Sequence, residues 1–195
     1  MTGDTGERVM RHSRNPLLIA ILLASGLCAR ASGKEFLTPK EIERIQDAQE
    51  VDKRTAIYLE AAALRLKTVE ERLTGKESAP GDPLEFFTVE DMLEGYYRIL
   101  RSVMFTLDEA TQHPRTEQAK VQKALKELKS KTEKGEKDLR VIKRLAEDKQ
   151  LEAVWKLVNQ ALDINRGAHE GAELGLERYS DKKPPPNPDL PEPDR

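Results

Sequence analysis

The chain has 195 residues, of which 35% are charged, 37% hydrophobic and 5% aromatic, and its mean hydropathy of -0.67 excludes a protein built from several membrane spans. Its 33 basic and 35 acidic residues nearly cancel, which argues against a dedicated nucleic-acid binder. The single cysteine excludes a disulfide framework and a cysteine-built zinc site. A composition rich in alanine, leucine, glutamate, lysine and arginine is typical of long helices.

The N-terminal segment has the pattern of a secretory signal peptide. Three arginines between residues 8 and 14 form a basic flank, and an apolar run from Leu17 to Ala24 follows. Together with the following residues 25–28, this run would span about 17 Å as a helix. That is too short for a bilayer core of about 30 Å. Ala29-Arg30-Ala31 is the small-x-small pattern that signal peptidase accepts. We therefore expect residues 1–31 to be removed by cleavage between Ala31 and Ser32.

Two alternatives to this cleavage stay open. The segment could be kept as an N-terminal anchor, or a lipid could be attached to Cys28, although Leu27 stands where a lipoprotein usually has a small residue. After cleavage the mature chain would have no cysteine and would carry 29 basic and 33 acidic residues. Its expected destination is the periplasm or the extracellular space, where a cysteine-free chain is indifferent to oxidation.

The first long helix is expected from Thr38 to about Leu73. Thr38 and Glu41 have the spacing of a capping box, and Pro39 suits the first helical position. We expect a bend around residues 50–54, because the apolar stripe is interrupted there. Apolar residues three and four positions apart mark the second half of this helix: Leu59, Ala62, Leu66, Val69 and Leu73.

A second helix is expected after the loop at residues 78–83, with Thr88 as its N-cap and its end at His113-Pro114. Its apolar residues keep a spacing of four and three that is typical of a coiled-coil packing seam: Val89, Leu93, Tyr96, Leu100, Val103, Leu107 and Ala110.

The third helix is expected at about Pro114–Ala146, with its weakest packing at Thr132 and Gly135. One uninterrupted helix from Pro114 to the end of the next apolar stripe would be nearly 100 Å long, at about 1.5 Å per residue. We therefore infer a turn at Glu147–Gln150. A fourth helix is then expected from near Asp148, with an apolar stripe of Leu151, Val154, Val158, Ala161, Ala168 and Ala172.

Residues 32–179 are therefore predicted to form an all-α, up-down antiparallel helical bundle of about four helices. Residues 75–112 have a net charge of -5 and residues 115–150 one of +5, which favours these two helices as antiparallel neighbours. Six of the 11 prolines lie in the last 12 residues. We expect residues 180–195 to form a disordered, solvated tail, as a spacer rather than as a proline-rich ligand.

The sequence indicates no catalytic, cofactor-binding or metal-binding residue, and we predict that the protein is not an enzyme. It contains no glycine-rich phosphate loop, HExxH or GxSxG motif, and no glutamate stands three residues before His113 or His169. One alternative stays open, a bundle haem protein with His169 and either Met92 or Met104 as axial ligands.

Gly167, Gly171 and Gly175 recur every four residues in the fourth helix. Each mid-helix glycine costs about 1 kcal/mol relative to alanine, and small residues at this spacing permit close approach of another backbone. We interpret them as a close-packing interface, against the alanines at 61–63 or against a partner. The alternative is that the helix frays after Asn165.

Residues 36–46 (FLTPKEIERIQ) and 58–63 (YLEAAA) resemble the opening of a group of uncharacterised exported bacterial helical proteins. The resemblance implies export and helices, and it brings no activity or site residues. We predict an exported structural or interaction protein whose partner is protein, either itself or an envelope component. Binding of nucleic acid and stable membrane insertion after cleavage are not expected. The alternative function is a periplasmic bundle that binds a small ligand or cofactor.

Overall fold

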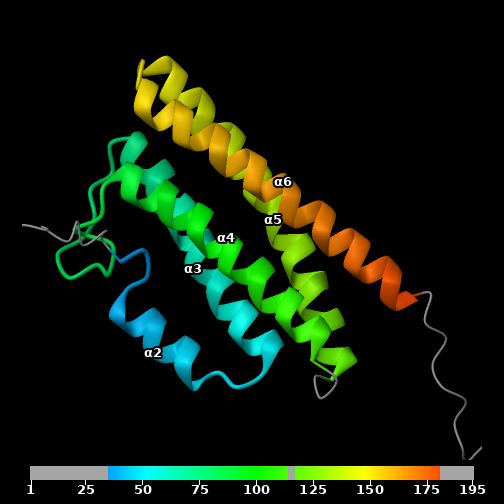
Figure 1. Ribbon diagram of the computed structural model, residues 1–195. Helices are drawn as coiled ribbons and strands as arrows, with labels where there is room; N and C mark the ends of the chain where they lie inside the picture. Colours follow the sequence, from blue (N-terminus) through cyan, green and yellow to red (C-terminus); the bar gives the residue numbers. More distant parts are fainter. Residues whose placement is uncertain (1–34, 114–116, 181–195) are drawn as a thin grey trace, which may run out of the picture. The chain divides into compact units, whose positions relative to one another are not determined.

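The computed structural model describes residues 35–113 and 117–180, all of which belong to the second of the chain's two units, Lys34–Arg195. These residues are 81% helical and include no strand, which confirms the predicted all-α class. The helices are α2 (Pro39–Asp47), α3 (Val51–Leu73), α4 (Val89–Gln112), α5 (Gln118–Asp148) and α6 (Glu152–Ser180) (Figure 1).

The predicted signal peptide, residues 1–31, lies outside the described residues, together with Cys28 and the cleavage site at Ala31 and Ser32. The predicted tail lies outside them from residue 181 onward, while Ser180 is the last residue of α6.

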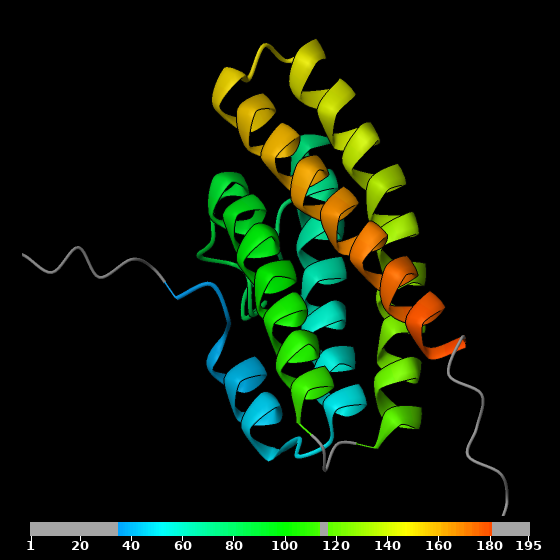
Figure 2. The same ribbon diagram turned by 45° about the vertical axis from the view of Figure 1, so that its right-hand side comes forward.

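Four long helices form a ring in the order α3, α4, α6, α5, because α3 and α6 each pack against both α4 and α5. Helices that follow one another in the chain run in opposite directions, as Figure 2 shows, whereas the ring neighbours α4 and α6 run in the same direction, as do α3 and α5. This is the predicted up-down antiparallel bundle, and the apolar stripes of the four helices face one another in a common core. Among the stripe residues, Leu151 is an exception, since it precedes α6 and is exposed.

The prediction that the acidic and basic helices are neighbours is wrong. α4 and α5 occupy opposite corners of the ring and touch far less than the adjacent helices do. Lysines of α5 pair instead with carboxylates of the helices that flank it. Lys123 lies 2.7 Å from Asp52 of α3, and Lys129 lies 2.8 Å from Glu173 of α6. Burial of apolar stripes therefore decided the helix order, and surface charges found their partners within it.

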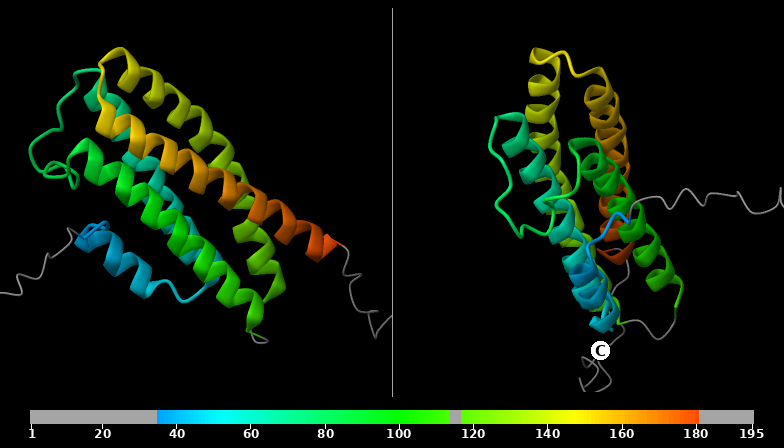
Figure 3. Two further views of the ribbon diagram at one scale, coloured as in Figure 1. Left: turned by 45° about the horizontal axis from the view of Figure 1, so that its top comes forward. Right: turned by 90° about the vertical axis from the view of Figure 1, so that its left-hand side faces the viewer.

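The bend expected around residues 50–54 is a complete break, so the first predicted helix is two helices. Ala48 has extended backbone angles, and its carbonyl oxygen accepts hydrogen bonds from Nε and Nη2 of Arg54 at 3.2 and 3.1 Å. The short helix α2 turns back alongside α3 and lies outside the ring (Figure 3).

Local signals for helix ends are confirmed at several positions. Thr38 and Thr88 each close a capping box at the start of α2 and α4. The third helix begins at Gln118 rather than Pro114, and the expected turn before the fourth helix is present. That turn includes Gln150 with a φ of 55°, a left-handed conformation that ends α5 sharply.

In the described ranges, no helix has both the length and the apolar character needed to cross a bilayer.

Candidate functional site

An open groove of about 690 Å³ lies between α2 and α4. It is lined by Ile45 and Gln46 of α2 and by Arg54 and Tyr58 of α3. One face of α4 lines it as well: Arg98, Arg101, Ser102, Phe105, Thr106 and Glu109. Because α2 packs on α3 and not on α4, the space between α2 and α4 is left open.

Apolar and aromatic surface lines much of this groove. Phe36, Ile45 and Tyr58 are partly buried against the core and present their remaining surface to the groove. Phe105 is 70% exposed and adds its ring to this apolar lining. Apolar side chains gathered in a groove and rimmed by polar groups are typical of an interaction site.

The charge of the groove is positive. Arg54, Arg98 and Arg101 line it, against the one lining carboxylate, that of Glu109. Within residues 35–113 and 117–180, none of these three arginines forms an ion pair. Arg101 lies over the ring of Tyr97, with 5.9 Å between its guanidinium carbon and the ring centroid. The groove therefore offers guanidinium groups whose charge is not neutralised by a neighbouring carboxylate.

A second hollow of about 400 Å³ extends the groove toward the break between α2 and α3, and both hollows share Arg54, Thr106 and Glu109. Here the lysine charge is already paired, since Lys120 lies 3.1 Å from Glu50, while Arg54 is shared with the groove. Hydrogen bonds from Lys53 and Lys120 hold the pKa of Glu50 below its ordinary value. Arg98 and Arg101 therefore give the groove the unpaired positive charge that the second hollow does not share.

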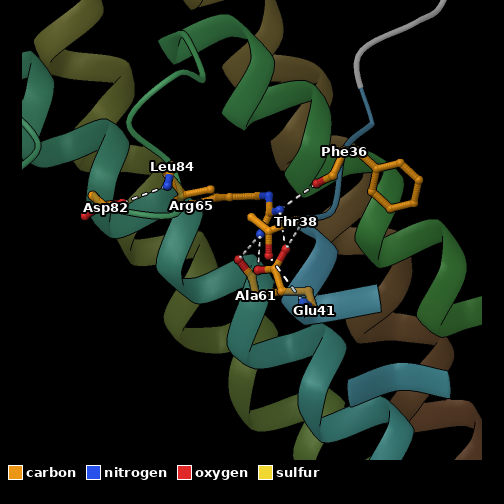
Figure 4. Close-up of polar contacts among 7 residues, drawn as sticks. All are labelled: Phe36, Thr38, Glu41, Ala61, Arg65, Asp82 and Leu84. Atoms are coloured by element: carbon orange, nitrogen blue, oxygen red, sulfur yellow. Dashed lines mark hydrogen bonds and ion pairs between the residues drawn. The ribbon is translucent and has the colours of Figure 1, made fainter. Parts of the chain in front are cut away.

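A buried ion pair holds the α2 side of the groove in place. Arg65 of α3 is fully buried and forms a bidentate pair with Glu41 of α2, with both N–O distances 2.9 Å (Figure 4). The same guanidinium donates to the carbonyl oxygens of Ala61 at 2.8 Å and Phe36 at 2.6 Å. Glu41 also accepts a hydrogen bond from the Thr38 backbone N–H at 2.7 Å. One guanidinium therefore ties α2 and the segment before it to α3.

Two features show how closely this anchor fits. A β-carbon on Gly95 of α4 would lie 3.0 Å from Nε of Arg65, so glycine leaves the room that the guanidinium needs. Burial raises the pKa of Glu41, but the hydrogen bonds from Arg65 and Thr38 outweigh it, and the pKa lies below its ordinary value. Glu41 is therefore held as a carboxylate, matched to the arginine.

A second buried polar cluster crosses the core. The Tyr96 hydroxyl of α4 donates to Oδ1 of Asn165 at 2.6 Å, and the Asn165 amide donates to the carbonyl oxygen of Thr132 at 3.0 Å. Burial, together with the charge of Asp138, raises the pKa of Tyr96 above its usual range. Gly135 makes room for the tyrosine hydroxyl, and a hollow of about 40 Å³ lies beside Thr132 and Gly135, so the predicted weak packing there stays a prediction.

His169 belongs to the edge of this cluster. Its Nδ1 lies 3.1 Å from Oγ1 of Thr132, and its Nε2 lies 3.5 Å from the carboxylate of Glu173. Met92 is fully buried, and Met104 lines a hollow of about 250 Å³ between α4 and α6. No group of three or more potential metal ligands is gathered among the described residues.

The structure separates the three glycines predicted to form one interface. Gly167 and Gly171 have no atom within 4 Å of a built β-carbon, whereas at Gly175 that atom would lie 3.0 Å from both methyl groups of Leu125. Docking against the alanines at 61–63 is wrong, because α6 packs on α4 and α5 and not on α3. α6 continues to Ser180, so fraying after Asn165 is wrong too. Packing of Gly167 and Gly171 against a partner stays a prediction.

The sequence analysis did not single out Arg65 or the groove arginines. An arginine between Ala62 and Leu66, inside an apolar stretch, was an available signal for a buried pair. The groove itself had no such signal, because it depends on where α2 lies after the break. Comparisons of the chain with family models, curated proteins and solved structures gave no match.

Proposed function

We propose that this chain is an exported helical-bundle protein without catalytic activity, which acts by binding another protein in the groove between α2 and α4. The observation that carries the proposal is the combination of a 70% exposed Phe105 with arginines that lack a carboxylate partner in the described residues. Aromatic and arginine side chains are the types that contribute most to protein interfaces.

The chemistry of the groove favours a partner segment that is extended, acidic and partly apolar. Its carboxylates would pair with Arg98 and Arg101, and its apolar side chains would cover Phe105 and Tyr58. An open groove between helices suits an extended segment, which can place successive side chains on both kinds of surface.

A small anionic ligand with an aromatic body is the second candidate. The groove volume of about 690 Å³ supports it, since ligand pockets commonly measure about 300–1,000 Å³. A melting temperature that rises with an aromatic carboxylate such as naphthoate, and does so only while Arg98 and Arg101 are intact, would favour this candidate.

The test of the protein-binding role is capture from the native envelope with a photo-crosslinking amino acid in place of Phe105. We expect specific crosslinked partners, and we expect Arg98→Glu combined with Arg101→Glu to abolish them. A matched control is Arg140→Glu combined with Arg144→Glu, which makes the same change in net charge on α5. Circular dichroism checks that each variant keeps its helices.

Loss of capture in the groove variant alone supports the proposed function. Equal capture by both variants, or equal loss in both, would contradict a role for the groove, since net charge or α5 would then govern binding.

A further inference from the structure

We propose that the proline-rich segment 181–195 of this chain, whose acidic part is residues 187–195, is an intramolecular occupant of the groove between α2 and α4, and that it competes there with the partner. The competition with a partner rests on the proposed function. The docking of the segment in the groove does not depend on it. It follows from charge, from reach and from the match between proline and aromatic surface.

Charge complementarity is the first argument. Residues 187–195 read NPDLPEPDR and contain three carboxylates, Asp189, Glu192 and Asp194, against one arginine. The groove has the opposite balance, with three arginines and one glutamate. Residues 181–186 have a net charge of +1, because Lys182 and Lys183 follow Asp181 and precede the prolines. These lysines would pass Asp108 and Glu109 of α4 on the way to the groove.

Reach is the second argument. Arg178 of α6 lines the same hollow as Asp108 and Thr111 of α4, so the end of α6 lies beside the C-terminal part of α4. Phe105 and Glu109, on the same stretch of α4, line the groove. The chain beyond Ser180 therefore has one helix to cross, a diameter of about 10–12 Å.

The length of the segment suffices for both the crossing and the binding. In the extended polyproline conformation, at about 3.1 Å per residue, residues 181–186 span about 19 Å and residues 187–195 about 28 Å. The stretch of α4 from Arg98 to Glu109 is about 17 Å long at 1.5 Å per residue.

The surface of the groove also suits a proline-rich segment. Proline-rich segments bind grooves lined by aromatic side chains, because their extended form is nearly preformed and loses little entropy on docking. Phe36, Tyr58 and Phe105 supply such a lining. With three residues per turn, Asp189 and Glu192 lie on one edge of the bound segment. That edge would face Arg98 and Arg101, and the prolines would cover the rings.

The test uses the full chain with a single thiol. In a protein carrying Cys28→Ser and Leu190→Cys, a nitroxide on the new cysteine broadens the amide resonances of nearby residues in ¹⁵N NMR spectra. We expect loss of signal for residues 98–109 and for α2, and full signal at the turn between α5 and α6. Arg98→Glu with Arg101→Glu should restore the signals, whereas Arg140→Glu with Arg144→Glu should not.

Uniform or absent broadening along the bundle would overturn the inference. So would broadening that appears only when nitroxide-labelled protein is mixed with separate ¹⁵N-labelled protein, since the segment would then bind a second copy. A chain ending at Ser180 retains all the described core residues, and it should capture more partner than the full chain does. If the full chain and the chain ending at Ser180 capture the partner equally through the groove, the proposed function holds. The claim that segment 181–195 competes with the partner is then contradicted. Groove-specific broadening with no partner captured by the shorter chain would contradict the proposed function and leave the docking intact.

Discussion

The hydroxyl oxygen of Tyr96 lies 2.6 Å from the position that a β-carbon would take on Gly135. The tyrosine cannot easily withdraw, because it is buried and hydrogen-bonded to Asn165 at 2.6 Å. Gly135→Ala should therefore destabilise the bundle. Overpacking typically costs about 1–3 kcal/mol, and the better helix propensity of alanine offsets about 1 kcal/mol of it. Urea unfolding measures the difference.

The same substitution at Gly167 is the matched control, because nothing lies within 4 Å of its β-carbon position. Gly167→Ala should be neutral or stabilising by up to about 1 kcal/mol. Adding Tyr96→Phe to Gly135→Ala should recover part of the loss, since it removes the clashing oxygen. A Gly135→Ala protein as stable as its parent would contradict the close fit.

The ion pair of Arg65 and Glu41 leads to a test by double substitution. Arg65→Met leaves the Glu41 carboxylate without its buried partner, and breaking a buried pair costs about 3–5 kcal/mol. Glu41→Gln keeps an N3 side chain that can serve the capping box with Thr38. The double variant should therefore be less destabilised than the two single changes combined. Additive losses, measured by chemical unfolding, would show that the two side chains are not coupled.

The low pKa of Glu41 predicts a loss of stability in acid. Because the folded pKa lies below the ordinary value of 4.5, the carboxylate contributes stability above that pH and loses it as the pH falls through the folded pKa. Asp52 acts in the same direction, because the hydrogen bond from Lys123 lowers its pKa despite burial. Unfolding free energies between about pH 6 and pH 3 should fall less steeply for Glu41→Gln than for Glu77→Gln, which changes an exposed loop carboxylate.

Gly171 and Gly175 should respond differently to leucine. At Gly175 the new side chain meets Leu125, whose methyl groups already lie 3.0 Å from the β-carbon position. Gly175→Leu should lower the melting temperature, with overpacking of about 1–3 kcal/mol. Gly171→Leu meets open space and should leave the melting temperature of the isolated chain unchanged or higher. A loss of oligomeric state in Gly171→Leu alone would instead support the predicted partner contact.

Export predicts a defined processing product. The short apolar run and Ala29-Arg30-Ala31 should direct cleavage before Ser32. The intact mass of the exported protein should equal that of residues 32–195. A retained N-terminal segment, or the added mass of lipid on Cys28, would contradict this cleavage.

Local patterns were sufficient to predict much of the bundle. The apolar stripe from Leu59 to Leu73 is buried along its length, and the capping boxes at Thr38 and Thr88 start their helices as expected. Caps and apolar stripes depend on residues within one or two helical turns of each other. They can therefore be predicted from the sequence alone. The turn before α6 was inferred from length, and the structure has it at Lys149–Leu151.

The order of the helices around the core and the contents of the candidate site needed the tertiary structure. Net charge favoured α4 and α5 as neighbours, but Lys123 and Lys129 pair with α3 and α6 because apolar burial had already set the arrangement. Burial of a stripe is worth far more than exposed ion pairs.

The sequence by itself determined where α2 and α4 begin, which faces the long helices bury and that the chain turns before α6. The tertiary structure decided that Gly135 adjoins Tyr96 while Gly171 faces open space, although both are glycines on a helix. It also decided that Phe36 and Arg98, far apart along the chain, line one groove. The physical reason is that helical periodicity is local, whereas a cavity or a close approach depends on the relative placement of helices.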